Sequence, residues 1–129
     1  MKKTTLLVIL FTALNWTANS NAVDSSKGKL VWSDEFDGTD LDYTKWGIEV
    51  NAFGGGNNEM QIYTDRAKNI RVENGNLIIE AHKDNANIAG TSRPFSSGRI
   101  RTRKRGDWQY GSIDVRAKLP VGKGIWPAI

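Results

Sequence analysis

Residues 112–119 alternate strictly between apolar and polar side chains, and this pattern limits the possible fold more than any other feature. The apolar members are Ile113, Val115, Ala117 and Leu119. Successive residues of a β-strand point to opposite faces, so the pattern predicts a strand with one buried face. Pro120 is expected to end this strand, because proline cannot donate a hydrogen bond to the ladder. Helical periodicity is nearly absent after the first 22 residues, and we therefore expect an all-β fold.

A β-hairpin is indicated around the tetrapeptide Glu73-Asn74-Gly75-Asn76. Asn-Gly tolerates positive φ at both positions, which a type I′ hairpin turn requires. We expect one strand to enter over Ile70–Val72 and the next to leave over Leu77–His82.

Other segments give weaker signals. Residues 97–104 are a further strand candidate, and residues 29–36 form a short strand or the approach to one. Residues 53–57 and 84–97 are expected to be loops, the second because it contains Gly90 and Pro94. Many short antiparallel strands joined by Gly and Asn turns are typical of a β-sandwich.

The first 22 residues have the composition of a secretory signal peptide. Lys2 and Lys3 precede the mostly apolar segment 4–14, and small residues follow at 20–22. These are the parts of a cleavable export signal. We expect a mature chain from Val23 that is secreted, either extracellular or periplasmic, and that has no membrane contact after cleavage.

Charge and cysteine content exclude several classes of protein. The formal net charge of +4 includes Lys2 and Lys3, and no acidic residue lies in the signal, so the mature charge is about +2. The basic run 99–105 would present a stripe of arginines on one strand face, which suits phosphate. Export and the small net charge favour a solvated sheet face instead, and we expect no nucleic-acid partner. There is no cysteine, so the fold cannot depend on disulfides.

Few residues are arranged for catalysis. His82 is the only histidine, and at a strand end a solvated role is favoured over a catalytic one. Glu35 and Asp37 share a face if their segment is extended, and paired carboxylates can serve as acid and nucleophile. A solvated acidic edge is the favoured interpretation of Asp34, Glu35 and Asp37. Trp126 is the tryptophan most suited to stack on a sugar ring, because Gly124 and Pro127 place it in a turn.

Several segments of the sequence occur in the same order as similar segments of a known protein family. They are Leu30–Gly38, Leu41–Asp42 with Lys45–Trp46, Asn57–Thr64, Asn69–Ile70 with Gly75–Ile79, Ser97–Ile100 and Tyr110–Pro127. In this order they resemble glycoside hydrolase family 16, the laminarinase-like endo-β-1,3-glucanases. Asn57–Thr64 matches the Asn-Asn-Glu-Leu-Gln-x-Tyr-Thr segment of laminarinase-like members.

The resemblance implies the N-terminal part of a concanavalin-like β-jelly-roll sandwich. It also implies retaining hydrolysis of internal β-1,3, or mixed β-1,3/1,4, glucan bonds. The family's catalytic motif, Glu-x-Asp-x-x-Glu, has no match in the sequence, so no catalytic residue is assigned. We expect residues 23–129 to be the N-terminal half of a family 16 domain, truncated before that motif, and this chain alone to be inactive.

The resemblance also implies the binding residues. Asn57, Asn58 and Arg99 would face the glycan, and Trp126 would line the cleft near the cleavage point. The implied partner is a polysaccharide, a β-glucan such as laminarin. The alternative function is a non-catalytic, lectin-like β-sandwich that binds glycan without cutting it.

A structural calcium ion is a further implication, while no cofactor is expected for catalysis. Many family members hold calcium partly through main-chain oxygens near the opening strand and the Asn-Gly hairpin. Glu35 and Gly75 are the matching positions here.

Overall fold

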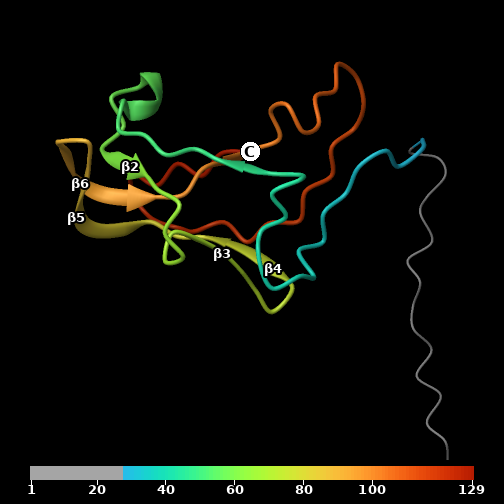
Figure 1. The fold of residues 1–129 in the computed structure, drawn as a ribbon, viewed down its shortest axis with the longest axis horizontal. Helices are drawn as coiled ribbons and strands as arrows, with labels where there is room; N and C mark the ends of the chain where they lie inside the picture. Colours follow the sequence, from blue (N-terminus) through green and yellow to red (C-terminus); the bar gives the residue numbers. More distant parts are fainter. Residues whose placement is uncertain (1–27) are drawn as a thin grey trace, which may run out of the picture.

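The computed structural model describes residues 28–129, shown as a coloured ribbon in Figure 1. The predicted signal peptide, residues 1–22, lies outside the described residues. The described elements are strands and one short 3₁₀ helix: β1 (Gly47–Ile48), η2 (Gly54–Gly56), β2 (Gln61–Tyr63), β3 (Ile70–Glu73), β4 (Asn76–Ile79), β5 (His82–Ile88), β6 (Thr91–Ser97) and β7 (Ile100–Arg101). The all-β prediction is confirmed.

The strands form three small sheets. The largest has the order β2-β6-β5, with β2 parallel to β6 and β5 antiparallel to β6. It lies at one end of the molecule, beside the β3–β4 hairpin (Figure 1). The third sheet pairs β1 with β7. This pairing brings the chain around residue 47 next to the chain around residue 101.

The predicted Asn-Gly hairpin is confirmed. Glu73 of β3 pairs with Asn76 of β4, and the two residues between them have φ of 52° (Asn74) and 70° (Gly75). Positive φ at both central positions is the geometry of a type I′ turn.

The loop prediction for residues 84–97 is wrong, because this segment forms most of the β5–β6 hairpin. Its turn is Ala89-Gly90, with φ of 47° and 81°, again positive at both positions. Pro94 fits because the register shifts between Lys83 and Ala86, which leaves two residues of β5 opposite this one proline. A bulge is a place where a strand tolerates a missing N–H donor.

The strand predictions for residues 112–119, 97–104 and 29–36 are wrong in whole or in part. No strand is found at 112–119 among residues 28–129, and Ile113 and Leu119 are 83% and 56% exposed. Alternation defines two faces, but a strand also needs a neighbour to receive its ladder hydrogen bonds. Only three residues of 97–104 are in strands, Ser97 at the end of β6 and the two residues of β7, and Lys104 with a φ of 64° turns the chain. Residues 29–36 approach the core without pairing.

The apolar core lies between the β3–β4 hairpin and the chain around β1. Its buried members are Leu41, Ile70 and Val72, and half-buried apolar residues pack against them. Trp46 is held by its ring contacts and by its indole N–H, which donates to Asp34 Oδ2 at 2.6 Å. Asp34, a member of the acidic segment, therefore has a structural role, whereas Glu35 and Asp37 are exposed.

A buried polar network joins the three-stranded sheet to the start of β3. Asn69, fully buried, accepts from Thr64 and donates to the Glu80 carbonyl and to Ser96 Oγ, at 2.5, 2.9 and 3.1 Å. Ser96 Oγ in turn donates to Asp84 Oδ2 at 3.1 Å. Asp84 is also paired with Lys68 and Arg66. The network fixes sequence-distant segments through hydrogen bonds where apolar contacts are few.

Acid is expected to weaken the sheet through Asp84. Its pKa is held below the ordinary value mainly by the hydrogen bond from Lys68, against the opposing effect of burial. A carboxyl group with a lowered folded-state pKa stabilises the fold above its unfolded pKa of about 3.9, and this stability is lost as pH falls through the folded pKa. Thermal unfolding followed by circular dichroism between pH 6 and 2 should show a smaller acid dependence for Asp84→Asn than for wild type. The exposed control Asp37→Asn should keep the wild-type dependence, and equal slopes for all three proteins would refute the assignment.

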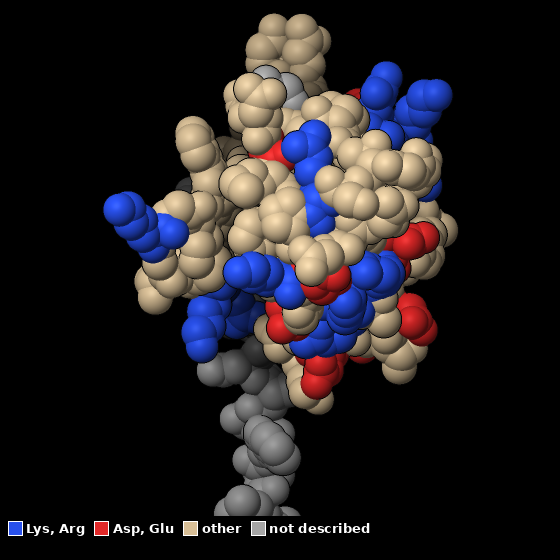
Figure 2. Space-filling model, turned by 90° about the vertical axis from the view of Figure 1, so that its left-hand side faces the viewer, with Lys and Arg blue, Asp and Glu red and all other residues tan. Residues whose placement is uncertain are grey.

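The surface carries both charges. On the face drawn in Figure 2, basic and acidic side chains are interspersed, so this face has no continuous stripe of one sign. Within residues 28–129, no helix has the length and apolar character needed to cross a membrane.

Candidate functional site

Three polar side chains lie in a row on β2 and the residues before it. Glu59, Gln61 and Tyr63 are two residues apart, so they share one face of the extended chain. The Tyr63 hydroxyl donates to Glu59 Oε2 at 2.6 Å. Gln61 Nε2 donates to Glu59 Oε2 at 3.0 Å and to the Tyr63 hydroxyl at 2.9 Å. Each side chain therefore fixes the other two.

Arg99 and Glu49 extend this row. The Arg99 guanidinium lies over the Tyr63 ring, 5.4 Å from its centroid, at a distance that allows cation–π attraction. Arg99 Nε is 3.3 Å from Glu49 Oε2, and Arg101 pairs with the other oxygen of the same carboxylate. We call Glu49, Glu59, Gln61, Tyr63 and Arg99 the polar row. Its five side chains come from three separate parts of the chain.

The environment of Tyr63 keeps its hydroxyl protonated. Burial raises its pKa, and the hydrogen bond donated to Glu59 raises the pKa further. A hydroxyl held in this way presents a fixed lone pair to a partner. The row is thus a preorganised set of donors and acceptors on a partly exposed face, which is what binding of a polyhydroxylated ligand requires.

The structure places two of the predicted glycan-facing residues at one end of the row. Asn57 and Asn58 follow η2 directly, are both exposed, and lead into Glu59. Asn58 has a φ of 55°, and the backbone N–H of Glu59 donates to Gly54 O at 3.1 Å. Arg99, the third predicted residue, lies over Tyr63 at the other end. Arg99 thus belongs to the polar row, and Asn57 and Asn58 precede its member Glu59 in sequence, while the glycan contacts of all three stay a prediction.

Trp126 is not joined to the row. It is 91% exposed, and no hydrogen bond or ring contact links it to the polar row within the described part of the chain. Its position in the cleft stays a prediction.

The predicted calcium positions do not make up a site by themselves. Glu35 is exposed, and Gly75 is the second turn residue of the β3–β4 hairpin. Calcium takes six to eight oxygen ligands, and two positions supply too few. Among residues 28–129 no group of three or more His, Cys, Asp or Glu side chains is placed to hold a metal. The calcium ion stays a prediction that needs further ligands.

Sequence reasoning missed most of the polar row. The spacing of Glu59, Gln61 and Tyr63 was a usable signal, because residues i, i+2 and i+4 share a strand face. Glu49 had no local signal, since its partners Arg99 and Arg101 lie about 50 residues further along the chain.

Comparison with known proteins shows which proteins the chain is similar to. No protein-family model matches the chain. Over all of the chain, the sequence is 39% identical to a β-glucanase of Rhodothermus marinus. It is 40% identical, over 78% of the chain, to a glucan endo-1,3-β-glucosidase A1 of Niallia circulans.

Solved structures give the same answer. The laminarinase of Rhodothermus marinus matches 64% of this chain at a TM-score of 0.57 and 44% identity. A family 16 endo-β-1,3(4)-glucanase, crystallised as a Glu→Ser mutant with a glucan oligosaccharide, matches 64% of the chain at a TM-score of 0.59 and 43% identity. The chain is similar to the laminarinase-like glucanases of glycoside hydrolase family 16. Its β-strands are those of the N-terminal part of the family's jelly roll, as the resemblance implied.

The chain matches only part of the length of each relative. The chain spans 44% of the Rhodothermus β-glucanase and 16% of the Niallia enzyme. It spans 32% and 34% of the two solved chains. What the whole family 16 protein does is therefore a separate question from what these residues contribute.

The hydrogen bonds of the polar row can be tested through Tyr63. We expect Glu59→Gln to lower the pKa of Tyr63 towards the ordinary value of about 10, because a neutral amide accepts the hydroxyl proton less strongly than a carboxylate. The difference in absorbance titration at 295 nm between Glu59→Gln and wild type, both lacking the exposed Tyr43 and Tyr110, reports this shift. Glu73→Gln, which removes a carboxylate outside the row, serves as the control. An unchanged Tyr63 titration in Glu59→Gln would disprove the contact.

Proposed function

We propose that the full-length protein carrying this chain is a secreted glycoside hydrolase. It cleaves internal β-1,3, or mixed β-1,3/1,4, bonds of a β-glucan and retains the anomeric configuration. The observation that carries the proposal is the 39% identity over the whole chain to a β-glucanase. The glucan oligosaccharide in the matched family 16 structure supports a β-glucan as the ligand class.

In this proposal the polar row, together with the adjoining Asn57 and Asn58, binds and orients the polysaccharide. Asn57 and Asn58 supply exposed amides, and Arg99 supplies a guanidinium that Glu49 and Tyr63 hold in place. Positioning of this kind lowers the barrier by fixing the sugar relative to the reacting groups.

The carboxylates of the row are not suited to be the catalytic pair. Glu59 accepts hydrogen bonds from Tyr63 and Gln61, and Glu49 is paired with two arginines. Retaining hydrolysis needs one carboxylate free to attack and a second that gives and takes a proton. The Glu-x-Asp-x-x-Glu motif that supplies them in the family is not among these 129 residues. The 129-residue chain by itself is therefore proposed to be inactive.

Laminarin hydrolysis is the test. The intact secreted protein is assayed for release of reducing ends, with NMR of the first product, and β-configured ends are expected. The chain alone is expected to match a no-protein control. Arg99→Ala is expected to raise KM about tenfold, the typical effect of losing a hydrogen bond from a charged group. Lys83→Ala, an exposed cation on β5, should leave KM unchanged.

Two outcomes would each overturn one part of the proposal, either hydrolysis or the role of the polar row. Laminarin binding without release of reducing ends by the intact protein would favour the lectin-like alternative. An unchanged KM in Arg99→Ala would remove the polar row from the binding surface while leaving the hydrolase assignment in place.

A further inference from the structure

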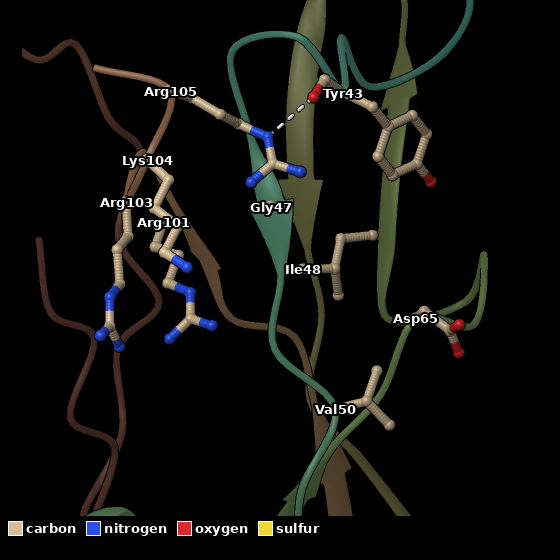
Figure 3. Close-up of a pocket in the computed structure, with 9 residues that line it drawn as sticks. All are labelled: Tyr43, Gly47, Ile48, Val50, Asp65, Arg101, Arg103, Lys104 and Arg105. Carbon is tan, nitrogen blue, oxygen red and sulfur yellow. Dashed lines mark hydrogen bonds between the residues drawn. The ribbon is translucent and has the colours of Figure 1, made fainter. Parts of the chain in front are cut away.

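A second concave surface lies next to the polar row, and cations form the largest group among its lining residues. It is a cavity of about 580 Å³ between β1, β7 and the turn after β7. Its lining residues are Tyr43, Gly47, Ile48, Val50, Asp65, Arg101, Arg103, Lys104 and Arg105 (Figure 3). We call this surface the basic hollow.

The charges of the basic hollow are poorly balanced. Arg101 forms an ion pair with Glu49, a carboxylate that it shares with Arg99. Arg105 donates from Nε to the neutral Tyr43 carbonyl at 2.8 Å. The side chains of Arg103 and Lys104 make no ion pair or hydrogen bond within residues 28–129, and Asp65 makes no ion pair there either. Arg103, Lys104 and Arg105 thus place three positive charges around the cavity against a single unpaired carboxylate, Asp65.

The backbone holds these cations in place. Gly106 N and Arg105 N both donate to Thr102 O, at 2.9 and 2.7 Å, and Lys104 has a φ of 64°. Positive φ is uncommon for a lysine, and such backbone conformations are enriched at ligand sites. The turn places consecutive cations on one rim, with Arg101 and Arg103 side by side and Arg105 reaching across β1 (Figure 3).

Gly47 makes room for the Arg105 guanidinium. A Cβ built on Gly47 would lie 2.8 Å from Arg105 Nη1 and 3.3 Å from its Cζ. The guanidinium therefore lies directly over the strand, and its terminal N–H groups stay available to a ligand.

We propose that the basic hollow binds an oxyanion substituent, a carboxylate or a sulfate ester, of an acidic polysaccharide. Guanidinium groups match the two oxygens of such groups in a bidentate manner. Apart from Asp65 and Gly47, the rest of the lining is apolar or aromatic, from Ile48, Val50 and Tyr43, and can contact the C–H face of a sugar ring. The volume is within the range of small-ligand pockets.

A nucleic acid fits this surface less well. Nucleic-acid grooves combine many unpaired cations along a track with aromatic platforms for stacked bases. Here the track is short, because Arg99 and Arg101 are both paired with Glu49. The proposal of an acidic polysaccharide rests on the proposed function, since it assumes a glycan-binding protein.

Affinity electrophoresis of the intact protein tests the proposal. The gels contain neutral laminarin, carboxymethylated laminarin, sulfated laminarin or single-stranded DNA, each at low and at moderate salt. We expect the acidic laminarins to retard the protein more than neutral laminarin does, and salt to reduce the difference. Stronger retardation by carboxymethylated laminarin would indicate a carboxylate site, and stronger retardation by sulfated laminarin would indicate a sulfate site.

Variants assign the retention to the hollow. Arg103→Gln with Lys104→Gln is expected to weaken retention by the acidic laminarins about tenfold, the effect of losing charge-assisted hydrogen bonds. Lys83→Gln with Lys118→Gln removes the same charge from exposed positions outside the hollow and should have little effect. Gly47→Ala displaces the Arg105 guanidinium without changing the charge, and should weaken retention while Gly38→Ala does not.

The outcomes separate this proposal from the hydrolase assignment. Laminarin hydrolysis together with equal retention of the hollow variants and their controls would refute the hollow alone. Retention by acidic polymers that depends on Arg103 and Lys104, without any laminarin hydrolysis, would support the hollow and refute the hydrolase assignment. If the hollow variants lost retention by DNA but kept retention by the acidic laminarins, the assignment of an acidic polysaccharide as the ligand would be overturned.

Discussion

Asn69→Ala is expected to lower the free energy of unfolding by about 3 kcal/mol, because it leaves buried polar groups without partners. Asn69 is fully buried and uses both ends of its amide. Its oxygen accepts from Thr64 and Arg66, and its nitrogen donates to Ser96 and to the Glu80 carbonyl. Alanine removes all four contacts and leaves the buried groups that made them without these partners.

Urea unfolding of the intact protein measures this change. The matched control is Asn87→Ala on β5, which removes an exposed amide bonded to Ser92 and should cost less than about 0.5 kcal/mol. Equal stability of Asn69→Ala and Asn87→Ala would show that the buried network does not hold the sheet to β3.

Local turn chemistry accounts for the part of the fold that the sequence predicts. The β3–β4 hairpin could be predicted because Asn74-Gly75 favours the φ values that its turn needs. The β5–β6 hairpin could not, because its turn is Ala89-Gly90 and its strands are mostly polar. Alanine at positive φ is held there by the strand pairing, which is a tertiary effect.

The choice of pairing partner for each strand explains the remaining differences between the predicted and the observed fold. The parallel pairing of β2 with β6 joins Ile62 to Ser96, and no local pattern at either residue specifies the other. The alternation over residues 112–119 gives two faces, but faces alone do not name the strand that would pair with it. Alternation with a period of two therefore predicts which side chains share a face, whereas formation of a strand depends on hydrogen bonds to a second segment.

The candidate site was also predictable from the sequence only in part. Asn57, Asn58 and Arg99 could be selected through the family resemblance, and the row formed by Glu59, Gln61 and Tyr63 was present as a spacing of two. Glu49 could not be found, since its role arises only where β1 meets β7. The contribution of the basic run also depended on structure, because Arg99 and Arg101 share an ion pair with Glu49, whereas the side chains of Arg103 and Lys104 form none within residues 28–129.

Gly98→Ala is expected to destabilise the fold by about 3 kcal/mol, at the upper end of the usual cost of overpacking. Gly98 links β6 to β7 and belongs to the Ser97–Ile100 segment through which the family resemblance was recognised. A Cβ at this position would lie 2.3 Å from Ile70 Cγ1 and 2.9 Å from the Asn69 carbonyl oxygen. Neither atom is the free end of a long side chain, so the clash is relieved only by moving β3 or the buried network.

The comparison with Gly38→Ala separates crowding from the general effect of adding a methyl group. A Cβ on Gly38 would lie no closer than 3.6 Å to any neighbouring atom, an ordinary contact. Thermal unfolding should therefore show a large loss for Gly98→Ala and little change for Gly38→Ala. Because Arg99 follows Gly98 directly, the same displacement is expected to move the guanidinium off Tyr63 and weaken laminarin binding. Full stability of Gly98→Ala would mean that the close packing of β3 against residue 98 is wrong, and that the glycine serves the adjacent binding residue instead.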